Sequence, residues 1–187
     1  MSDTQAQNYT FVFMGVSGSG KSAVASGVAQ KTNAAFLDGD FLHPRANIQK
    51  MALGHALNDE DRQPWLAALN DAIFAMQRTN PISLVVCSAL KKSYRDKLRE
   101  GNKNLYFIYL KGDAELIENR LKARKGHFFK PEMLVSQFQA LQEPTSEEQD
   151  VHVVDIRPSL DEVIENTRTA IHQIVSGGNS WTPQLKH

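Results

Sequence analysis

The stretch Gly15-Val16-Ser17-Gly18-Ser19-Gly20-Lys21-Ser22 decides the fold, because it joins an apolar run, Tyr9–Met14 (YTFVFM), to a run of small residues that ends near Lys31. It fits the pattern G-x-x-x-x-G-K-[ST], in which glycines let backbone amides turn inward around an anion. We expect a buried strand, a phosphate-binding loop and then a helix whose N-terminal end adds positive charge at the same point. The alternative is a chance match in a glycine-rich turn.

These residues predict a nucleoside triphosphate site. The loop from Gly15 to Ser22 would hold the phosphates, Lys21 would reach the β- and γ-phosphates, and the Ser22 hydroxyl would bind Mg²⁺.

Short apolar runs alternate with helical patterns along the rest of the chain. After the first strand, the expected strands are Ala35–Leu37, Ser83–Ser88, Leu105–Leu110 and Val151–Ile156. Apolar runs that are continuous rather than alternating indicate a parallel sheet that is covered by helices on both faces. We therefore expect one three-layer α/β domain over residues 1–175, followed by a polar, flexible tail over 176–187.

The helix boundaries also carry signals. Asn58–Asp61 places acidic residues in a first turn, and Ser159 with Glu162 fits a capping box. Lys91–Arg99 reads as a charged helix, and Asp113 can cap another helix.

Composition excludes several classes of protein. The 187 residues contain 21 Lys+Arg and 21 Asp+Glu, so no basic surplus points to nucleic acid. No run approaches the ~20 apolar residues of a membrane span, and the polar N-terminal residues do not resemble a secretory signal. Cys87 is alone, which excludes an intramolecular disulfide, and we expect it in the core. A cytoplasmic protein is the expectation.

Asp38-Gly39-Asp40 comes at the end of the second strand, at the edge where open α/β sheets bind ligands. Alternate strand residues point to one side, so the two carboxylates could converge, with Gly39 leaving room for a substrate. One carboxylate could then organise Mg²⁺ while the other accepts a hydroxyl proton. The alternative is an ordinary turn.

The third strand ends in Ser88-Ala89-Leu90-Lys91, where many nucleotide-binding proteins of this type place an acidic residue. Metal binding must therefore fall to Ser22, to Asp38 or to water. His43 and His127 lack the partners that a zinc site needs.

Two further segments are rich in polar groups. A short helix is expected to begin at Pro44, directly after His43, and Arg62 follows it near the start of the next helix, where it could pair with a carboxylate. Arg120 and Arg124 lie four residues apart on one helix face, and a basic segment follows them. A cationic cover over residues 122–137 could close on a nucleotide, and Asp155–Pro158 could border its base. The alternatives are solvated helix faces.

The chain resembles the gluconate kinase family, within the shikimate kinase and nucleoside monophosphate kinase fold group. The matching segments are GVSGSGKS at 15–22, DGDxLHPxxNIxKM at 38–51, LNDEDRxPWL at 57–66, CSALKKxYRDxLR at 87–99 and KARKGHF at 122–128. The resemblance implies a five-stranded parallel sheet with the phosphate-loop strand at its centre, a homodimer, and ATP- and Mg²⁺-dependent phosphorylation of D-gluconate at its 6-hydroxyl.

The same resemblance implies roles for individual residues. Asp40 would bind the acceptor and Arg62 its carboxylate, Arg120 would lie against adenine, and Arg124 would face the phosphates. Further substrate contacts are implied for His43, Lys91 and His127. Lys21, Asp40 and Arg124 are the expected catalytic residues, since in-line phosphoryl transfer depends on positioning and charge neutralisation.

Two rival hypotheses stay open at this point: a shikimate or nucleotide kinase, and a nucleotide-dependent switch that hydrolyses ATP slowly and signals through a partner.

Overall fold

The structure is a computed structural model that describes residues 7–124 and 130–177. Strands and helices alternate in it along the chain. Their order is β1 Tyr9–Met14, α1 Lys21–Thr32, β2 Ala35–Asp38, a 3₁₀ turn Gly39–Leu42, α2 Arg45–Ala52, α3 Asp59–Thr79, β3 Ile82–Val86, α4 Lys92–Arg99, β4 Leu105–Lys111, α5 Ala114–Ala123, α6 Pro131–Ala140, β5 Val151–Asp155 and α7 Leu160–Gly177.

The strands form a sheet of five in the order β2-β3-β1-β4-β5, and every neighbouring pair is parallel. The phosphate-loop strand β1 is therefore central. All six of its residues are buried, which explains why its apolar run is continuous. The expected fold, a parallel α/β sheet of five strands, is confirmed.

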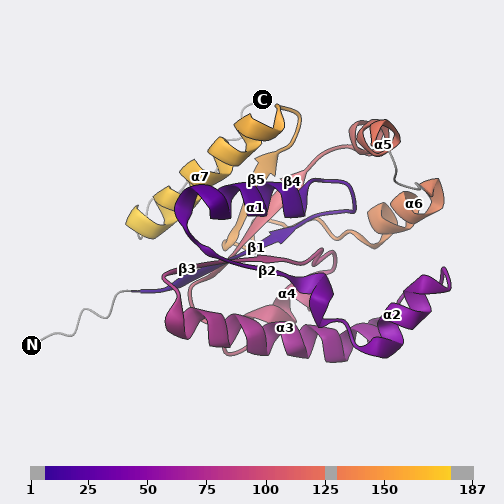
Figure 1. Ribbon diagram of the computed structural model, residues 1–187, viewed down its shortest axis with the longest axis horizontal. Helices are drawn as coiled ribbons and strands as arrows, with labels where there is room; N and C mark the ends of the chain where they lie inside the picture. Colours follow the sequence, from indigo (N-terminus) through magenta and orange to yellow (C-terminus); the bar gives the residue numbers. More distant parts are fainter. Residues whose placement is uncertain (1–6, 125–129, 178–187) are drawn as a thin grey trace, which may run out of the picture.

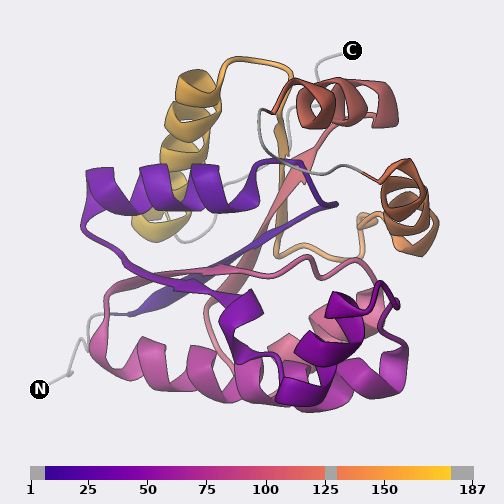
Figure 2. The same ribbon diagram turned by 45° about the vertical axis from the view of Figure 1, so that its right-hand side comes forward.

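Helices cover both faces of the sheet (Figure 1), and the layers stay separate when the molecule is turned (Figure 2). Successive strand residues point to opposite faces, so β1, β3, β4 and β5 each supply buried residues to both cores. The core beneath α1 and α7 contains the strand residues Phe11, Phe13, Leu84, Val86, Ile108 and Leu110. The core beneath α3 and α4 contains Val12, Met14, Val85, Cys87, Phe107 and Tyr109.

Most element ends agree with expectation, and the exceptions have local causes. Strand β3 ends at Val86, yet Cys87 N still donates to Phe13 O at 3.1 Å, so pairing with β1 continues past the strand. Helix α4 begins at Lys92, one residue later than expected. The predicted capping box of Ser159 with Glu162 is present, and the helix start predicted at Asn58–Asp61 is also a capping box. Helix α7 continues through Gly177, so the first two residues of the expected tail are helical.

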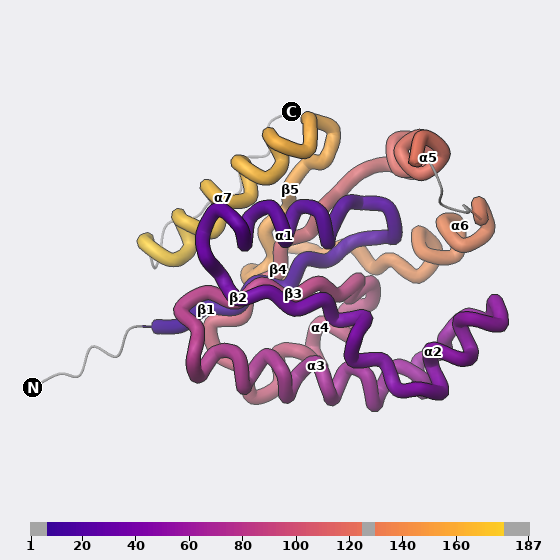
Figure 3. The backbone as a smooth tube through the Cα atoms, in the orientation of Figure 1, coloured from indigo at the N-terminus to yellow at the C-terminus, as the bar shows by residue number. Residues whose placement is uncertain are grey.

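The connections that follow the strands meet at one end of the molecule. The tube trace shows α2, α5 and α6 gathered at that end, although they come from different thirds of the chain (Figure 3). A Cβ atom at Gly54, just after α2, would lie 3.9 Å from Lys130 Nζ, just before α6. Among the helices of the described ranges, none has the length and hydropathy to cross a membrane.

Candidate active site

The phosphate loop has the backbone that its glycines predict. Gly15, Gly18 and Gly20 have φ angles of 144°, 83° and 92°, which L-residues rarely adopt. At Gly15 a Cβ atom would lie only 2.9 Å from Leu110 O, so a side chain is excluded there as well. Within residues 7–124 and 130–177 no side chain caps the start of α1, which leaves its first amides directed at the loop. The loop is therefore built as an anion site.

Lys21 lies across this loop. Its Nζ atom donates to the carbonyl oxygens of Gly15 and Val16, at 3.0 Å each. Desolvation lowers the pKa of Lys21 to about 8, while the carboxylates of Asp40 and Asp38 act in the opposite direction. Both carboxylates therefore lie near the Lys21 ammonium group, and Ser22, the next residue of α1, contacts Asp38 directly. The chemistry of the expected site depends on this arrangement.

The residues beside Lys21 fit Mg²⁺. Ser22 Oγ donates to Asp38 Oδ2 at 3.5 Å, which brings two hard oxygen ligands together. The hydroxyl of Ser19 is buried and has no hydrogen-bond partner in the described part of the chain, as expected of a group reserved for a ligand. The described residues contain no cluster of three or more His, Cys, Asp or Glu that could hold a metal.

The route by which Asp40 reaches the site differs from expectation. Asp38 ends β2, and its carboxylate accepts from Asp40 N at 3.0 Å, which starts the 3₁₀ turn. Strand alternation therefore does not place Asp40, and that expectation is wrong. Gly39 is also explained differently: a Cβ there would lie 2.3 Å from Val86 O. Gly39 allows the turn to pack against β3 and does not make room for a substrate. Asp40 itself projects outward, with 82% of its side chain exposed.

His43 forms the wall next to Asp40. Its ring stacks on Trp65 at a centroid distance of 4.2 Å, and its Nε2 lies 4.0 Å from Asp40 Oδ1. Burial lowers the pKa of His43, although Asp40 acts to raise it. The Nδ2 group of Asn47 donates to Asp61 O at 2.8 Å, which fixes the amide orientation, and it lies 3.3 Å from His43 Nδ1. The neutral ring therefore accepts at Nδ1 and presents Nε2–H toward Asp40.

Arg62 and Lys91 form a pair of cations at Tyr94, whose ring both contact. The guanidinium of Arg62 lies 5.5 Å from the Tyr94 ring centre and Lys91 Nζ lies 5.6 Å from it. Arg62 Nη1 donates to Leu57 O at 2.8 Å, while Lys91 Nζ contacts Asp59 Oδ1 at 3.0 Å. Hydrogen bonds from Tyr94 and Lys91 lower the pKa of Asp59. A negatively charged acceptor would meet two positive side chains here.

Arg120 and Arg124 line a cavity of about 260 Å³ next to the phosphate loop. Arg120 Nη2 lies 3.4 Å from the carbonyl oxygens of Arg157 and Pro158. The rest of the wall contains loop and α1 residues and the segment after β5: Gly18, Ser19, Gly20, Ala23, Val24, Leu121, Ile156, Pro158, Leu160 and Val163. The apolar lining and the two arginines would suit a nucleotide base and its phosphates.

The sequence predicts a core position for Cys87 and implies a substrate contact for His127. Cys87 is buried, and desolvation raises its thiol pKa to about 12, in agreement with a core role. Residues 125–129 of the expected cover over 122–137, His127 among them, lie outside the described residues.

Sequence reasoning also missed three residues. Asp59 lies in the quoted LNDEDR segment, and Tyr94 follows Lys91 at helical spacing, so the sequence contained a signal for both residues. Gln137 was not, because its Oε1 accepts from Ser17 N across 120 residues of chain.

Together these features define a class, the phosphate-loop kinases of small molecules, in which the nucleotide and the acceptor bind at one edge of the sheet. Residues 17–172 match a family model described as shikimate kinase. The thermoresistant gluconokinase of Escherichia coli K12 is 69% identical over 167 residues, which cover 89% of this chain and 95% of that protein. The chain belongs to the gluconokinase family.

Solved structures agree. The crystal structure of a gluconokinase from Sinorhizobium meliloti 1021 has a TM-score of 0.81 at 37% identity, covering 91% of this chain and 95% of that one. An APS kinase from Mycobacterium tuberculosis, at 19% identity and a TM-score of 0.61, covers 89% of this chain and 98% of its own and shares the fold.

Proposed function

We propose that this chain transfers the γ-phosphoryl group of ATP to the 6-hydroxyl of D-gluconate, giving 6-phospho-D-gluconate and ADP. The observation that carries the proposal is the 69% identity to a gluconokinase over 89% of the chain. The arrangement of the site supports it, because the exposed carboxylate of Asp40 acts on Lys21 of the phosphate loop, and the cations Arg62 and Lys91 lie together beside Tyr94.

The phosphate loop and Lys21 would bind the nucleotide. The Lys21 ammonium group donates hydrogen bonds to two carbonyl oxygens of the loop. The charged phosphates of a bound nucleotide would accept stronger hydrogen bonds from it than these neutral carbonyls do. Ser22 and Asp38 would hold Mg²⁺, which neutralises phosphate charge when bound. Arg120 would lie along the base, and Arg124 would face the phosphates from the cavity wall that both share.

Asp40 would orient the acceptor hydroxyl and accept its proton. An exposed carboxylate with a neutral histidine beside it can take a proton without first breaking an ion pair. Arg62 and Lys91 would bind the gluconate carboxylate, and His43 would contact the sugar chain beside them. His127, in the cover segment, is a further substrate contact that we propose from the family resemblance alone.

A direct screen of acceptors tests this function. ADP release from ATP is measured with gluconate, with shikimate, with a nucleoside monophosphate and without an acceptor. We expect stimulation by gluconate alone. Stimulation by another acceptor would assign a different kinase, and acceptor-independent hydrolysis would favour a nucleotide switch.

We also propose a homodimer, a cytoplasmic location, a cover over residues 122–137 and a flexible tail that follows α7. The family resemblance supports the dimer, which light scattering of the purified chain would test.

A further inference from the structure

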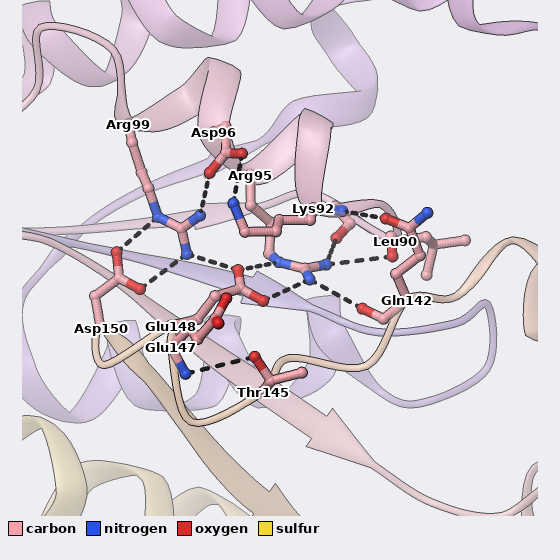
Figure 4. A network of polar contacts seen from close by, with 11 residues as sticks. Leu90, Lys92, Arg95, Asp96, Arg99, Gln142, Thr145, Glu147, Glu148 and Asp150 are labelled. Carbon is pink, nitrogen blue, oxygen red and sulfur yellow. Dashed lines mark hydrogen bonds and ion pairs between the residues drawn. The ribbon is translucent and has the colours of Figure 1, made fainter.

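Arg95 is a charged side chain enclosed by three segments of the chain, and only 1% of it is exposed. Its Nε and Nη2 atoms grip the two carboxylate oxygens of Glu148 at 2.7 and 2.8 Å. Its Nη1 donates to Ala89 O at 2.8 Å and to Leu90 O at 3.2 Å. Figure 4 shows the guanidinium between these partners. A buried cation with every group satisfied is a highly specific arrangement.

The turn that Arg95 grips, residues 87–91, lies between both halves of the site. Ser88 O accepts from Gly15 N, the first amide of the phosphate loop, at 3.1 Å. Lys91, at the other end of the turn, pairs with Asp59 and lies over the Tyr94 ring, beside Arg62. Between them, Ala89 is buried and has a φ of 44°, a conformation that costs a non-glycine residue free energy. The surroundings must therefore hold this turn in place.

Gln142 holds the same turn from the opposite side. Its backbone amide donates to Leu90 O at 2.8 Å, and its Oε1 accepts from Lys92 N at 2.9 Å. Its own carbonyl accepts from Arg95 Nη2 at 2.9 Å. Gln142 lies two residues after the end of α6, and α6 also contacts the phosphate loop through Gln137. Arg95 thus links the turn 87–91 to the segment that follows α6 through hydrogen bonds from one guanidinium group.

We infer that Arg95 is a positioning residue, which holds the turn 87–91 so that Lys91 meets the acceptor while Ser88 supports the phosphate loop. Stability alone does not account for it, because well-packed apolar residues often replace a buried ion pair without loss. Ala89 has a left-handed backbone conformation, and its carbonyl oxygen needs a hydrogen-bond donor to hold it there. The planar guanidinium of Arg95 supplies that donor and binds Glu148 at the same time. The acceptor part of the inference rests on the proposed function.

Arg99 provides a matched control on the same helix. It donates to Glu148 at 2.8 Å, as Arg95 does, and its other hydrogen bonds go to Asp96 and Asp150. Figure 4 shows both arginines on the shared carboxylate, with Arg99 on the side away from Leu90. Loss of either arginine leaves Glu148 paired with the other.

The experiment compares Arg95→Met with Arg99→Met in the full chain, at a temperature where both are folded. The readouts are residue-resolved hydrogen exchange at Gly15 N and steady-state kinetics with gluconate and ATP. For Arg95→Met we expect exchange at least tenfold faster and a gluconate KM about tenfold higher, with the KM for ATP changed less than threefold. For Arg99→Met we expect less than twofold changes in all three.

Equal effects in the two variants would overturn the inference, because a role limited to folding predicts them. If the wild-type chain fails to phosphorylate gluconate, the proposed function fails, and exchange at Gly15 still decides whether Arg95 holds the turn.

Should Arg95→Met not fold, Gln142→Ala replaces it, since Gln142 is exposed and loses only its side-chain bond to Lys92 N. An increase of about threefold in gluconate KM and faster exchange at Gly15 support the inference, and no change in either refutes it.

Discussion

The ring of His43 lies nearly parallel to that of Trp65, with 14° between the planes and 4.2 Å between the centroids. The indole Nε1 of Trp65 also donates to Gly39 O at 2.8 Å. One side chain from α3 thus supports the turn that carries Asp40 from two directions. The position of the proposed general base depends on a residue that has no chemistry of its own in the reaction.

Replacing Trp65 should therefore affect both stability and catalysis. Trp65→Phe leaves the buried Gly39 carbonyl without its donor and shrinks the surface beneath His43, so we expect a loss of about 2 kcal/mol in the free energy of unfolding. We also expect gluconate kcat/KM to fall about tenfold. Urea unfolding and steady-state kinetics measure these effects. The control is Phe74→Leu on the exposed face of the same helix, which should change neither. Unchanged kinetics in Trp65→Phe would contradict the supporting role.

Asp40→Asn removes the proposed base while keeping its size. We expect kcat to fall by about 10²- to 10⁴-fold, with the Kd for ATP changed less than about twofold, because the phosphate loop is untouched. Stopped-flow phosphate transfer and a nucleotide-binding titration separate the two quantities. Normal turnover in this variant would remove Asp40 from the mechanism.

Lys91→Met removes one of the two cations proposed to bind the gluconate carboxylate. Since a hydrogen bond to a charged group contributes about 1.5–3 kcal/mol, we expect gluconate KM to rise roughly 10- to 100-fold. The adjacent Lys92→Met is the control, because Lys92 pairs with Asp96 on the exposed side of α4. A similar KM in the two variants would show that Lys91 does not bind the acceptor.

Burial lowers the pKa of Lys21 to about 8, so we expect its amine to react with electrophiles at a lower pH than an exposed lysine does. Above that pH the neutral amine predominates, whereas an ordinary lysine titrates near 10.4. We expect an amine-directed label at low concentration to modify Lys21 increasingly as the pH rises from 7 to 9, and ATP to protect it by restoring the charged form. Peptide mass spectrometry over the labelled chain checks this. A labelling rate at Lys21 that follows the exposed lysines would contradict it.

Local chemistry explains what could be predicted from the sequence. The phosphate loop, the strand before it and the helix after it depend on residues next to one another in the chain, as do the capping boxes at Asn58 and Ser159. β1 and β3 are largely apolar along their length because both of their faces are buried, so the parallel sheet could also be predicted from the sequence. These features need no information about distant contacts.

The rest of the site was decided by tertiary packing. The sequence alone determined a phosphate-loop α/β domain with an acidic segment after its second strand, because glycine geometry and apolar periodicity act over short ranges. Only the folded chain decided that a 3₁₀ turn, and not strand alternation, presents Asp40. It also decided that Trp65 supports His43 and that Arg95, Glu148 and Gln142 hold the turn before Lys91. Those contacts join residues up to 53 positions apart, and no short-range pattern encodes which distant partner fills a buried site.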